Sequence, residues 1–436
     1  MEKTITKISV CWLRRDLRLE DNAALYHALK SGFPVLLFFV FDIYILDKLP
    51  NRKDSRVEFI HEQLEKINKV LHSKGSSLVV LHSTPEKALR GLLMKYEVQQ
   101  VYANHDYEPY ASERDEHIKS LLKEKGINFF TFKDQVIYEK KEVMKPDATP
   151  YTVFTPYSRV WKEKLFNDSL PELPSEDFLN NFLKMPPKEL LSLSEIGFEA
   201  SGVKIPETEL SEELIKNYDQ TRDLPALEGT SRLGVHLRFG TISIRQVVKT
   251  ALKLNETFLN ELIWREFFMM ILYHFPEVTH HNFRRKYDRI QWRNNEKEFD
   301  LWCKGETGYL LVDAGMKQLN ETGWMHNRVR MIVAGFLTKH LLIDWRWGEA
   351  YFAEKLLDYE LASNNGNWQW AAGTGCDSAP YFRIFNPHLQ LEKFDPELKY
   401  VKTWLPDFDT RNCPPVVDHS FARQRALQTY KQALNK

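Results

Sequence analysis

Cysteine is scarce in this sequence, which holds only four among 436 residues. The four lie far apart and form neither a CxxC pair nor the spacing of a zinc site, so we predict no structural metal and no disulfide framework. Free thiols are typical of a protein from a reducing compartment. The residues are Cys11, Cys303, Cys376 and Cys413.

Long apolar runs are missing as well. The longest one, Val35–Phe41, is far too short to cross a bilayer. The first residues, Met1–Ile8, are polar and mixed, and they do not have the pattern of a secretory signal. We therefore expect a cytoplasmic protein with no membrane attachment.

A surplus of one charge is also absent, because 60 Lys and Arg residues balance 60 Asp and Glu residues. Overall charge therefore predicts no anionic partner, and any nucleic-acid surface must be a local patch. Neither the GxGxxG fingerprint nor a Walker P-loop occurs, which argues against the usual NAD and ATP sites. Aromatic residues, by contrast, are abundant, at 13% with 11 Trp.

Residues 1–132 alternate short apolar runs with amphipathic segments. Continuous apolar strands joined by helices are typical of a buried parallel sheet, which binds ligands at the carboxyl ends of its strands. After the first strand, the arginines of Trp12–Arg18 could reach a phosphate or carboxylate, or equally form surface pairs with nearby acids. Helical patterns cover 56–72 and 112–125, and the predicted strands are Ile8–Trp12, Pro34–Phe41, Ser77–Leu81, Gln100–Ala103 and Ile127–Phe132.

From residue 133 to 210 the periodicity fades, while prolines and acidic residues accumulate. This composition predicts a connector that runs over the surface. The exception is Tyr151–Trp161, an aromatic-rich piece that we expect to pack on a domain. From residue 211 onward the pattern is helical. The predicted divisions are therefore 1–132, 133–210 and 211–436.

One helical segment places Glu261, Trp264 and Arg265 at i, i+3 and i+4, so that they share a face. This spacing suits either a core tryptophan flanked by an ion pair or a binding surface. Further along, Arg330 is a candidate partner for Asp358. Because a buried pair of this kind is weak evidence of stability, it invites a functional explanation.

The stretch from Trp345 to Pro387 combines large aromatics with amides, carboxylates and glycines. This combination suits a flat ring system with polar edges, and the glycines would let the backbone approach something bulky. From composition alone, a core helix followed by a loop is the alternative.

Two other segments suggest contacts with anions. Gly229–Gly234 is rich in small residues and hydroxyls and precedes a helical segment, a setting that suits phosphate. His281–Arg293 carries five Lys and Arg residues against one acid, with aromatics between them. That cluster is a candidate surface for DNA phosphates, or simply a solvated face.

Together, in this order, the motifs resemble the photolyase/cryptochrome family, and most of all its class I cyclobutane pyrimidine dimer (CPD) photolyases. The resemblance spans nearly the whole chain. It implies an α/β antenna domain with a Rossmann-like parallel sheet, followed by an all-α domain that binds FAD. The motifs are WLRRDLRLEDN from Trp12, YTVFTPY from Tyr151, GTSRL from Gly229, ELIWREF from Glu261, WMHNR from Trp324 and the stretch from Trp345.

The resemblance also implies a cofactor site. Asn364 would face the flavin N5, and the Arg330–Asp358 pair would lie against the flavin ring. Asn367 stands where we expect Gly. The remaining implied contacts to FAD are Tyr218, Thr230, Ser231, Arg232, Leu233, Gly234 and Glu360.

Three tryptophans, Trp368, Trp345 and Trp292, match the chain of indoles that carries an electron from the surface to excited flavin in this family. The N-terminal domain would hold an antenna chromophore, either a folate or a deazaflavin. Residues 107–109 are a candidate folate contact.

The implied substrate cavity lies beside the flavin. Trp264 and Trp370 would stack against a flipped-out dimer, and Glu261 would hydrogen-bond the pyrimidine edge and stabilise the charge that develops there. Met331 favours dimer repair, because six-four photolyases place a catalytic His nearby. The other implied DNA contacts are Arg265, Asn327, Arg328 and Arg383.

The activity implied is light-driven repair of UV-damaged DNA by a monomer, associated with the nucleoid if the protein is bacterial. Excited reduced FAD would pass an electron to the dimer, the cyclobutane ring would split, and the electron would return. A cryptochrome-type photoreceptor and a six-four photolyase are the alternatives, although cryptochromes usually carry a long C-terminal extension and only a short segment follows His419. A dark flavoprotein or a plain nucleic-acid binder is a further alternative.

Overall fold

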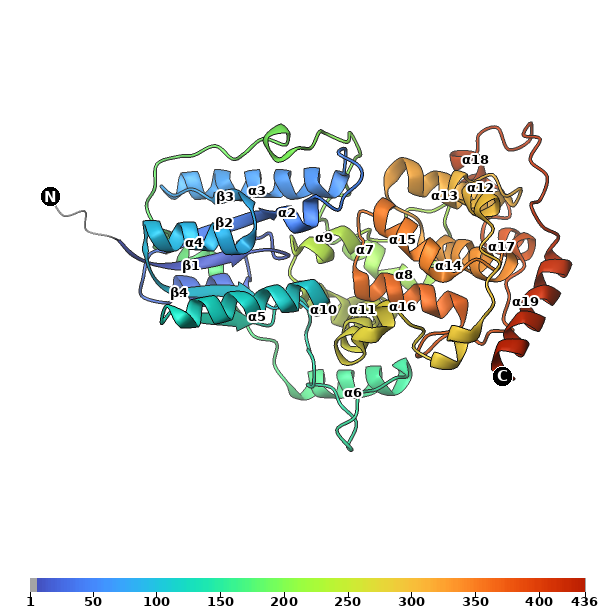
Figure 1. Ribbon diagram of the computed structural model, residues 1–436, viewed down its shortest axis with the longest axis horizontal. Helices are drawn as coiled ribbons and strands as arrows, with labels where there is room; N and C mark the ends of the chain where they lie inside the picture. Colours follow the sequence, from blue (N-terminus) through green and yellow to red (C-terminus); the bar gives the residue numbers. More distant parts are fainter. Residues whose placement is uncertain (1–5, 436) are drawn as a thin grey trace. The chain divides into compact units, whose positions relative to one another are not determined.

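The computed structural model describes residues 6–435 and divides the chain into two compact units (Figure 1). Residues 1–5, part of the stretch in which we predict no secretory signal, lie outside the described residues. The residues of the predicted connector, 133–210, are shared between the two units. The first unit holds residues up to 139, 165–208 and 233–249, and the second holds 140–164, 209–232 and the residues from 250 onward.

A five-stranded parallel sheet forms the centre of the first unit, with the strand order β3-β2-β1-β4-β5. Each strand overlaps a predicted one, which confirms the α/β class of this region. The inner strand β2 is buried along its whole length, since helices cover both faces of the sheet. The strands are β1 (Lys7–Leu13), β2 (Val35–Asp42), β3 (Val79–Ser83), β4 (Glu97–Asn104) and β5 (Asn128–Phe132).

Helices of the first unit pack on the two faces of this sheet. On one face, α4 and α5 bury leucines such as Leu89 and Leu121 against Val10 and Phe38. Right-handed crossovers place α1 and α3 on the other face, and Figure 1 shows α3 and α5 on opposite sides. The helices of this unit are α1 (Ala23–Leu29), α2 (Ile43–Leu46), α3 (Ser55–Ser73), α4 (Pro85–Lys95), α5 (Pro109–Glu124), η1 (Ser175–Asn181), η2 (Ser194–Ile196), α9 (Gly234–Phe239) and α10 (Ile244–Leu254), whose last five residues belong to the second unit.

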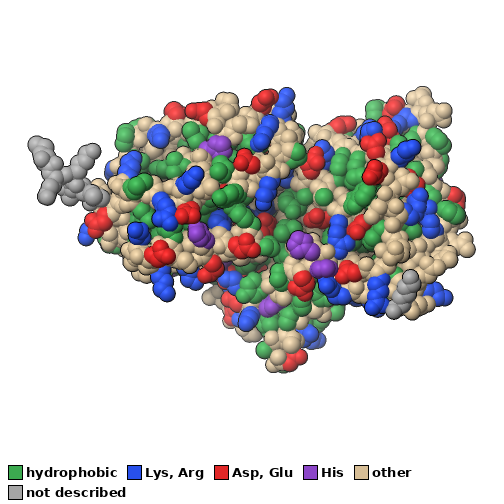
Figure 2. Space-filling model, viewed as in Figure 1, with side chains coloured by type: hydrophobic (Ala, Val, Ile, Leu, Met, Phe, Trp, Pro, Cys, Tyr) green, Lys and Arg blue, Asp and Glu red, His purple; other side chains and the backbone are tan. Residues whose placement is uncertain are grey.

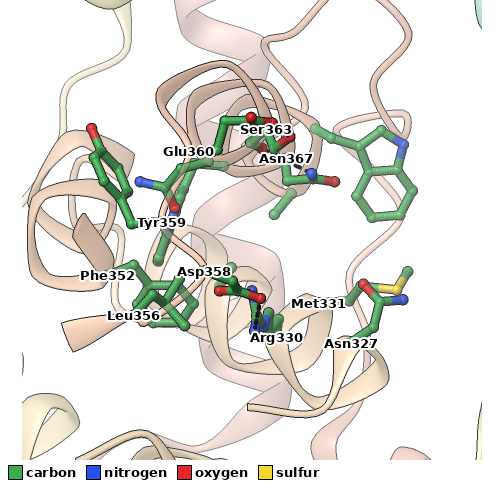
Figure 3. Close-up of a pocket in the computed structure, with 15 residues that line it drawn as sticks. Asn327, Arg330, Met331, Phe352, Leu356, Asp358, Tyr359, Glu360, Ser363 and Asn367 are labelled. Atoms are coloured by element: carbon green, nitrogen blue, oxygen red, sulfur yellow. Dashed lines mark hydrogen bonds and ion pairs between the residues drawn. The ribbon is translucent and has the colours of Figure 1, made fainter. Parts of the chain in front are cut away.

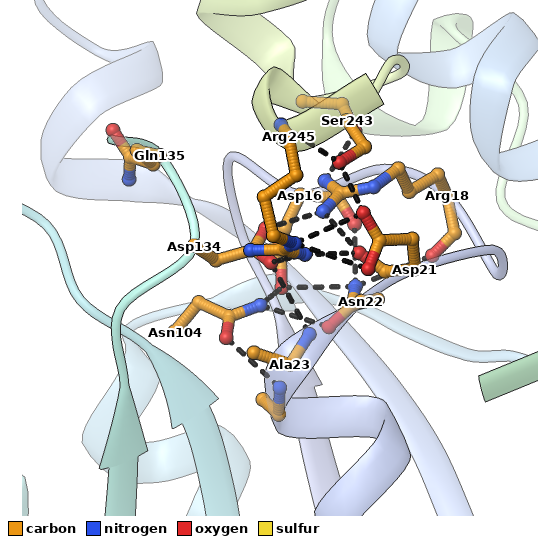
Figure 4. Close-up of polar contacts among 12 residues, drawn as sticks. Asp16, Arg18, Asp21, Asn22, Ala23, Asn104, Asp134, Gln135, Ser243 and Arg245 are labelled. Carbon is orange, nitrogen blue, oxygen red and sulfur yellow. Dashed lines mark hydrogen bonds and ion pairs between the residues drawn. The ribbon is translucent and has the colours of Figure 1, made fainter. Parts of the chain in front are cut away.

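A buried ionic cluster closes the first unit at the carboxyl ends of β1, β4 and β5 (Figure 4). Asp134 accepts from Arg18 Nη2 at 2.7 Å and from Arg245 Nη2 at 2.9 Å. Arg245 reaches in from α10 and also pairs with Asp21 at 3.0 Å. Because this pairing ties α10 to the loops that follow β1 and β5, it explains why residues 233–249 belong to the α/β unit.

Helices are the regular elements of the second unit within its described residues, as predicted, and loops connect them. At α15 and α16 the helices approach closely, since a Cβ at Gly348 would collide with the Trp368 ring. Its helices are α6 (Phe154–Asn167), α7 (Glu212–Lys216), α8 (Tyr218–Thr221), α11 (Glu256–His274), η3 (Pro276–Thr279), η4 (Arg285–Arg289), α12 (Glu296–Lys304), α13 (Leu310–Thr322), α14 (Asn327–Gly335), η5 (Phe336–His340), α15 (Trp345–Lys355), α16 (Leu361–Ala372), α17 (Pro387–Phe394), α18 (Lys399–Trp404) and α19 (His419–Leu434).

Within residues 6–435, no helix combines the length and the apolar character that a membrane crossing requires. Over the same residues, no group of three or more His, Cys, Asp or Glu side chains is arranged to hold a metal ion.

Candidate functional site

A pocket in the second unit collects many of the residues that the sequence singles out (Figure 3). Side chains of α14, α15, α16 and the turn before α16 form its walls. The predicted residues among them are Asn327, Arg330, Met331, Asp358, Glu360, Asn364, Asn367, Trp368 and Trp370, and the other lining residues include Phe352, Leu356, Tyr359 and Ser363. Apolar rings on one side and amides and charges on the other give the mixed lining that a flat, polar-edged ring system needs.

The predicted Arg330–Asp358 pair is present, and it is bidentate. Nη1 and Nη2 of Arg330 donate to the two oxygens of Asp358 at 3.2 and 3.0 Å. Arg330 Nε donates to the Met325 carbonyl at 2.7 Å, which fixes the plane of the guanidinium. The pair therefore presents a fixed polar edge to the pocket, as Figure 3 shows.

Asn364 is buried on α16, and its amide has a defined orientation. Its Nδ2 donates to the backbone oxygen and to Oε1 of Glu349 on α15, at 3.0 and 2.9 Å. Burial raises the pKa of the Glu349 carboxyl, against the opposing effect of this hydrogen bond. Since both donor contacts go to Glu349, the amide oxygen of Asn364 is the atom left to accept a hydrogen bond from a ligand.

Glu360 joins the pocket to α11. One of its oxygens accepts from Arg265 Nη2 at 3.1 Å, and the other accepts from the Ser363 hydroxyl at 2.9 Å. The sequence predicts a role for Arg265 in binding DNA, and the structure places its guanidinium against a carboxylate that lines the pocket.

All three predicted tryptophans of the electron path contact one hydrophobic core. Trp345 and Trp368 are buried members of it, and Trp292 packs against it with partial exposure. The Trp345 indole N–H donates to the buried Asn282 Oδ1 at 2.9 Å. Trp368, which lines the pocket, and Trp345 are thus buried, and Trp292 is the one of the three that is partly exposed.

Glu261 and Trp264 lie outside the pocket lining, on the face of α11 that they were predicted to share. Arg222 Nη1 donates to Glu261 Oε1 at 2.5 Å. Burial raises the pKa of the Glu261 carboxyl, and the charge of Arg222 acts against that rise. The Glu261 carboxyl is thus held in an ion pair, and 33% of the side chain is exposed.

At the start of α14, Asn327 and Met331 line the pocket, and Arg328 contacts Met331 from outside the lining. Arg328 Nη2 pairs with Asp223 at 2.7 Å, and its Nη1 lies 3.6 Å from Met331 Sδ. The preceding residue, His326, is fully buried and caps the helix by accepting from Arg328 N through Nδ1. Burial lowers the pKa of His326 to about 4, so this cap is a neutral imidazole.

The predicted phosphate loop, Gly229–Gly234, follows α8 in the chain and leads into α9. Arg232 has a left-handed φ of 52°, pairs with Glu228 at 2.7 Å and covers the Trp324 ring. Tyr218 is buried against Phe258 on α11. Thr230 and Ser231, just before Arg232, lie in an irregular segment. Leu233 and Gly234 lead into α9 in the first unit.

The basic segment 281–293 exposes its charges. The side chains of Arg284, Arg285, Lys286 and Arg289 are exposed, as is Arg383 in the loop after α16. Figure 2 shows basic and acidic side chains interspersed on the face in view, in line with the balanced composition. Any surface for DNA phosphates is therefore local.

A second cavity lies within the first unit, beside the carboxyl ends of β1 and β2. Phe39, Phe41 and Ile45 give it an apolar side, and Arg14 and Arg114 each lie 5.0 Å from the Trp12 ring centroid on its polar side. The side chains of Arg14 and Arg15 are thus largely buried and paired with acids from α5 and from the loop after β4, rather than with the acids next to them in sequence. The pairs are Arg14–Asp115, Arg15–Asp106 and Arg15–Glu108.

The fold places residues 107–109 at this cavity only in part. Glu108 lines it, whereas Tyr107 is buried and donates its hydroxyl to Glu139 at 2.6 Å. An apolar slot bordered by paired charges suits a flat chromophore with polar groups, so this cavity is the candidate place for an antenna cofactor in the first unit.

Two residues that hydrogen-bond to predicted site residues were not predicted from the sequence. Glu349 orients Asn364 from fifteen positions away on another helix, and Arg222 holds Glu261 from a turn 39 positions earlier. Neither residue shares a helical spacing with its partner, so only the tertiary fold reveals them.

Comparisons with known proteins agree with these features. A family model described as DNA photolyase matches residues 9–175, and one described as the FAD binding domain of DNA photolyase matches residues 258–413. Deoxyribodipyrimidine photo-lyases of Alkalihalophilus pseudofirmus and Escherichia coli are each 35% identical to this chain, over 97% of it and 98% of their own length.

Solved structures are similar over the whole chain. The class III photolyase of Agrobacterium tumefaciens is 32% identical, with a TM-score of 0.85 over 99% of this chain and 98% of that one. The photolyase of Sulfolobus tokodaii, solved with two FAD molecules, is 33% identical, with a TM-score of 0.79 over 97% of this chain and 99% of that one.

Proposed function

Because the chain belongs to the DNA photolyase family, we propose that it uses FAD and light to repair cyclobutane pyrimidine dimers in UV-damaged DNA. The observation that carries this proposal is the pocket between α14 and α16, where a fixed Arg330–Asp358 pair, an oriented Asn364 and the buried Trp368 meet. FAD, when bound and reduced, supplies the electron that visible light makes available.

The donor set of the pocket suits an isoalloxazine. Trp368 and Phe352 provide apolar walls, and Arg330 provides a cation for the electron-rich edge of a reduced ring. The amide oxygen of Asn364 can accept from a ring N–H. We assign the remaining cofactor contacts to Glu360, to Tyr218 and to the loop residues Thr230, Ser231, Arg232, Leu233 and Gly234.

We assign lesion recognition to side chains around the same pocket. Trp264 and Trp370 would stack on the flipped-out bases, each stack contributing about 1–3 kcal/mol. Asn327 and Met331 would contact the lesion at the pocket edge, and Glu261 would hydrogen-bond its polar rim while Arg222 holds the carboxyl in place. Arg265, Arg328 and Arg383 would reach the phosphates beside it.

Electron supply from the surface would follow Trp292, Trp345 and Trp368, whose indoles contact one core. Their role is to reduce oxidised FAD before repair begins. We further propose that the chain acts as a monomer in the cytoplasm, on the nucleoid if it is bacterial, which light scattering of the purified protein and fractionation of cells would check.

The decisive experiment is blue-light repair of two defined oligonucleotides, one with a cyclobutane dimer and one with a six-four product. We expect repair of the first alone, with no repair in the dark. Repair of the six-four product, or of neither lesion by flavin-loaded protein, would contradict the proposal. In the second case a signalling photoreceptor would be the better interpretation.

A further inference from the structure

The aromatic segment Tyr151–Trp161, which runs into α6, has no role in the function proposed above, yet one of its rings packs on a residue of the proposed lesion site. Phe154, the first residue of α6, stacks face to face on Trp264, with ring centroids 3.7 Å apart and planes 5° from parallel. Both residues belong to the second unit. We propose that Phe154 is a positioning residue for lesion binding, which holds the Trp264 indole in the orientation that a flipped-out pyrimidine dimer requires.

A third ring, that of Phe267, contacts both members of the stack. Phe267 is fully buried and stands edge-on to both partners, at 5.9 Å and 82° to Phe154 and at 5.6 Å and 86° to Trp264. Edge-to-face contacts of this kind are favourable and directional, so they set the tilt of the stacked pair. The indole is therefore held on one face and at its base, and it keeps partial exposure.

Phe154 itself is anchored from both sides. Its backbone N–H donates to Asp377 Oδ2 at 3.0 Å, in the loop that follows α16. On the same face of α6, one and two turns on, Tyr157 and Trp161 are buried and hydrogen-bond the buried carboxylate of Glu266 on α11. Because two separate attachments fix α6, the Phe154 ring is a rigid support rather than a loose loop side chain.

The same packing leads back to the cofactor pocket. On the next turn of α11, Phe268 lies 5.5 Å from Trp264, and a Cβ at Gly366 of α16 would collide with the Phe268 ring. Gly366 stands between Asn364 and Trp370 in the sequence of α16. Phe268 thus connects the Phe154–Trp264 stack to α16, the helix that carries Asn364 and Trp370.

The inference rests on the proposed function, because that function supplies the pyrimidine dimer as the substrate. One measurement without DNA therefore tests the role of Phe154 independently of the substrate. In protein labelled with 5-fluorotryptophan, the Trp264 signal is identified by its loss in Trp264→Phe. We expect this signal to shift or broaden in Phe154→Ala and Phe154→Leu, because the ring current of the stacked phenyl is lost, and to stay in place in Phe154→Tyr. An unmoved signal in the Ala and Leu variants would overturn the proposal, whatever the DNA experiments show.

Binding then tests the consequence for the lesion. We expect Phe154→Ala to weaken binding of a dimer-containing oligonucleotide about 3- to 10-fold, the value of one aromatic pair, and to leave affinity for undamaged DNA unchanged. Repair at saturating substrate should change by less than about twofold, because Phe154 acts on affinity. Phe154→Tyr should restore binding. The matched control is Phe166→Ala, on the same helix with 91% of its surface exposed, which should change nothing.

A double substitution separates positioning from direct contact. In a Trp264→Ala background, Phe154→Ala should cost no further affinity, because the ring that it supports is gone. An equal loss in both backgrounds, or tighter binding by Phe154→Ala, would overturn the proposal. If the wild-type protein does not prefer dimer-containing DNA although the fluorine signal behaves as expected, the proposed function fails while the role of Phe154 in orienting Trp264 stands. Flavin content and unfolding temperature identify a variant that has lost its fold, and Phe154→Leu then replaces Phe154→Ala.

Discussion

Each unit contains a cluster in which arginine donates to a carboxylate, and the two clusters differ in what surrounds them. In the first unit, Asp134 lies between Arg18 and Arg245, and the three side chains are 1%, 5% and 4% exposed (Figure 4). In the second unit, Arg330 and Asp358 are 25% and 16% exposed and line a pocket (Figure 3). The first arrangement is closed by the chain's own groups, whereas the second leaves one side open to a ligand.

This difference shows that an arginine beside a carboxylate does not by itself mark a functional site. A charge that is fully buried must be partnered by the protein, because removing it from water costs several kcal/mol. A pair at a pocket wall keeps part of its hydration until a ligand replaces the water. The closed cluster should therefore affect stability, and the open pair should affect ligand binding.

The largest expected effect breaks the closed cluster. Arg245→Ala should lower the free energy of unfolding by about 3–5 kcal/mol, because it leaves Asp134 and Asp21 with one partner fewer in a buried place. Chemical denaturation followed by circular dichroism measures this loss. The matched control, Arg90→Ala, removes an exposed pair with Glu86 and should cost at most about 1 kcal/mol. Equal costs for both variants would mean that burial is not what matters.

The second prediction concerns acid, to which the buried groups of the two units should respond differently. Burial alone would raise the pKa of Asp134, but Arg18 and Arg245 lower it, so this carboxylate stays charged as the pH falls towards 4. In the second unit, burial lowers the pKa of His326 to about 4, below the ordinary value of about 6.5. The neutral imidazole therefore stabilises the fold above pH 6.5, and this contribution, up to about 3 kcal/mol, is lost as the pH falls through 4.

The measurement is the free energy of unfolding of the wild type and of His326→Asn between pH 7 and 4.5. Asn can still cap α14 but does not titrate, so we expect its stability to fall less steeply. The matched control is His117→Asn, at a side chain that is 60% exposed. Parallel pH curves for the wild type and His326→Asn would contradict this account.

Sequence reasoning located the elements of both units because their signals are local. The strand Val35–Asp42 is a continuous apolar run, and α11 and α16 carry their motifs within a few turns. The Arg330–Asp358 pair was also predicted, first as a candidate pairing and then as part of the cofactor site that the family resemblance implies. The closed cluster was not, since Asp134 and Arg245 are 111 residues apart and no periodicity connects them. The aromatic segment that holds Phe154 was expected to pack on a domain, but its contact with Trp264 is known only from the fold. The roles of Arg222 and Glu349 likewise depend on contacts that no sequence pattern indicates.

A smaller change should loosen the open pair without unfolding the protein. In Asp358→Asn the amide keeps an acceptor for Arg330 but loses its charge, so we expect a stability loss of about 1 kcal/mol and about tenfold weaker binding of FAD. Fluorescence titration of flavin-free protein measures the affinity, and denaturation of the same protein measures the stability. A stability loss as large as that of Arg245→Ala, with unchanged flavin affinity, would remove the distinction between the two clusters.

The smallest change alters the open site and touches no ion pair. Glu349 accepts from the Asn364 amide and so determines which atom of that amide faces the pocket. Glu349→Gln keeps an acceptor at the same place, whereas Glu349→Leu removes it and leaves only the backbone oxygen. We expect both variants to retain FAD and to lose about 1 kcal/mol of stability or less, because part of the cost is offset by removing a buried carboxyl.

The two variants should differ in redox behaviour. An amide oxygen that faces the ring accepts from a protonated ring nitrogen and thus favours reduced FAD, while a rotated amide would oppose it. Spectroelectrochemical titration should therefore find oxidised FAD harder to reduce in Glu349→Leu and nearly unchanged in Glu349→Gln. If the two variants have the same reduction potential as the wild type, the orientation of Asn364 is of no consequence for the cofactor. The open site would then depend on its ion pair and its aromatic walls alone.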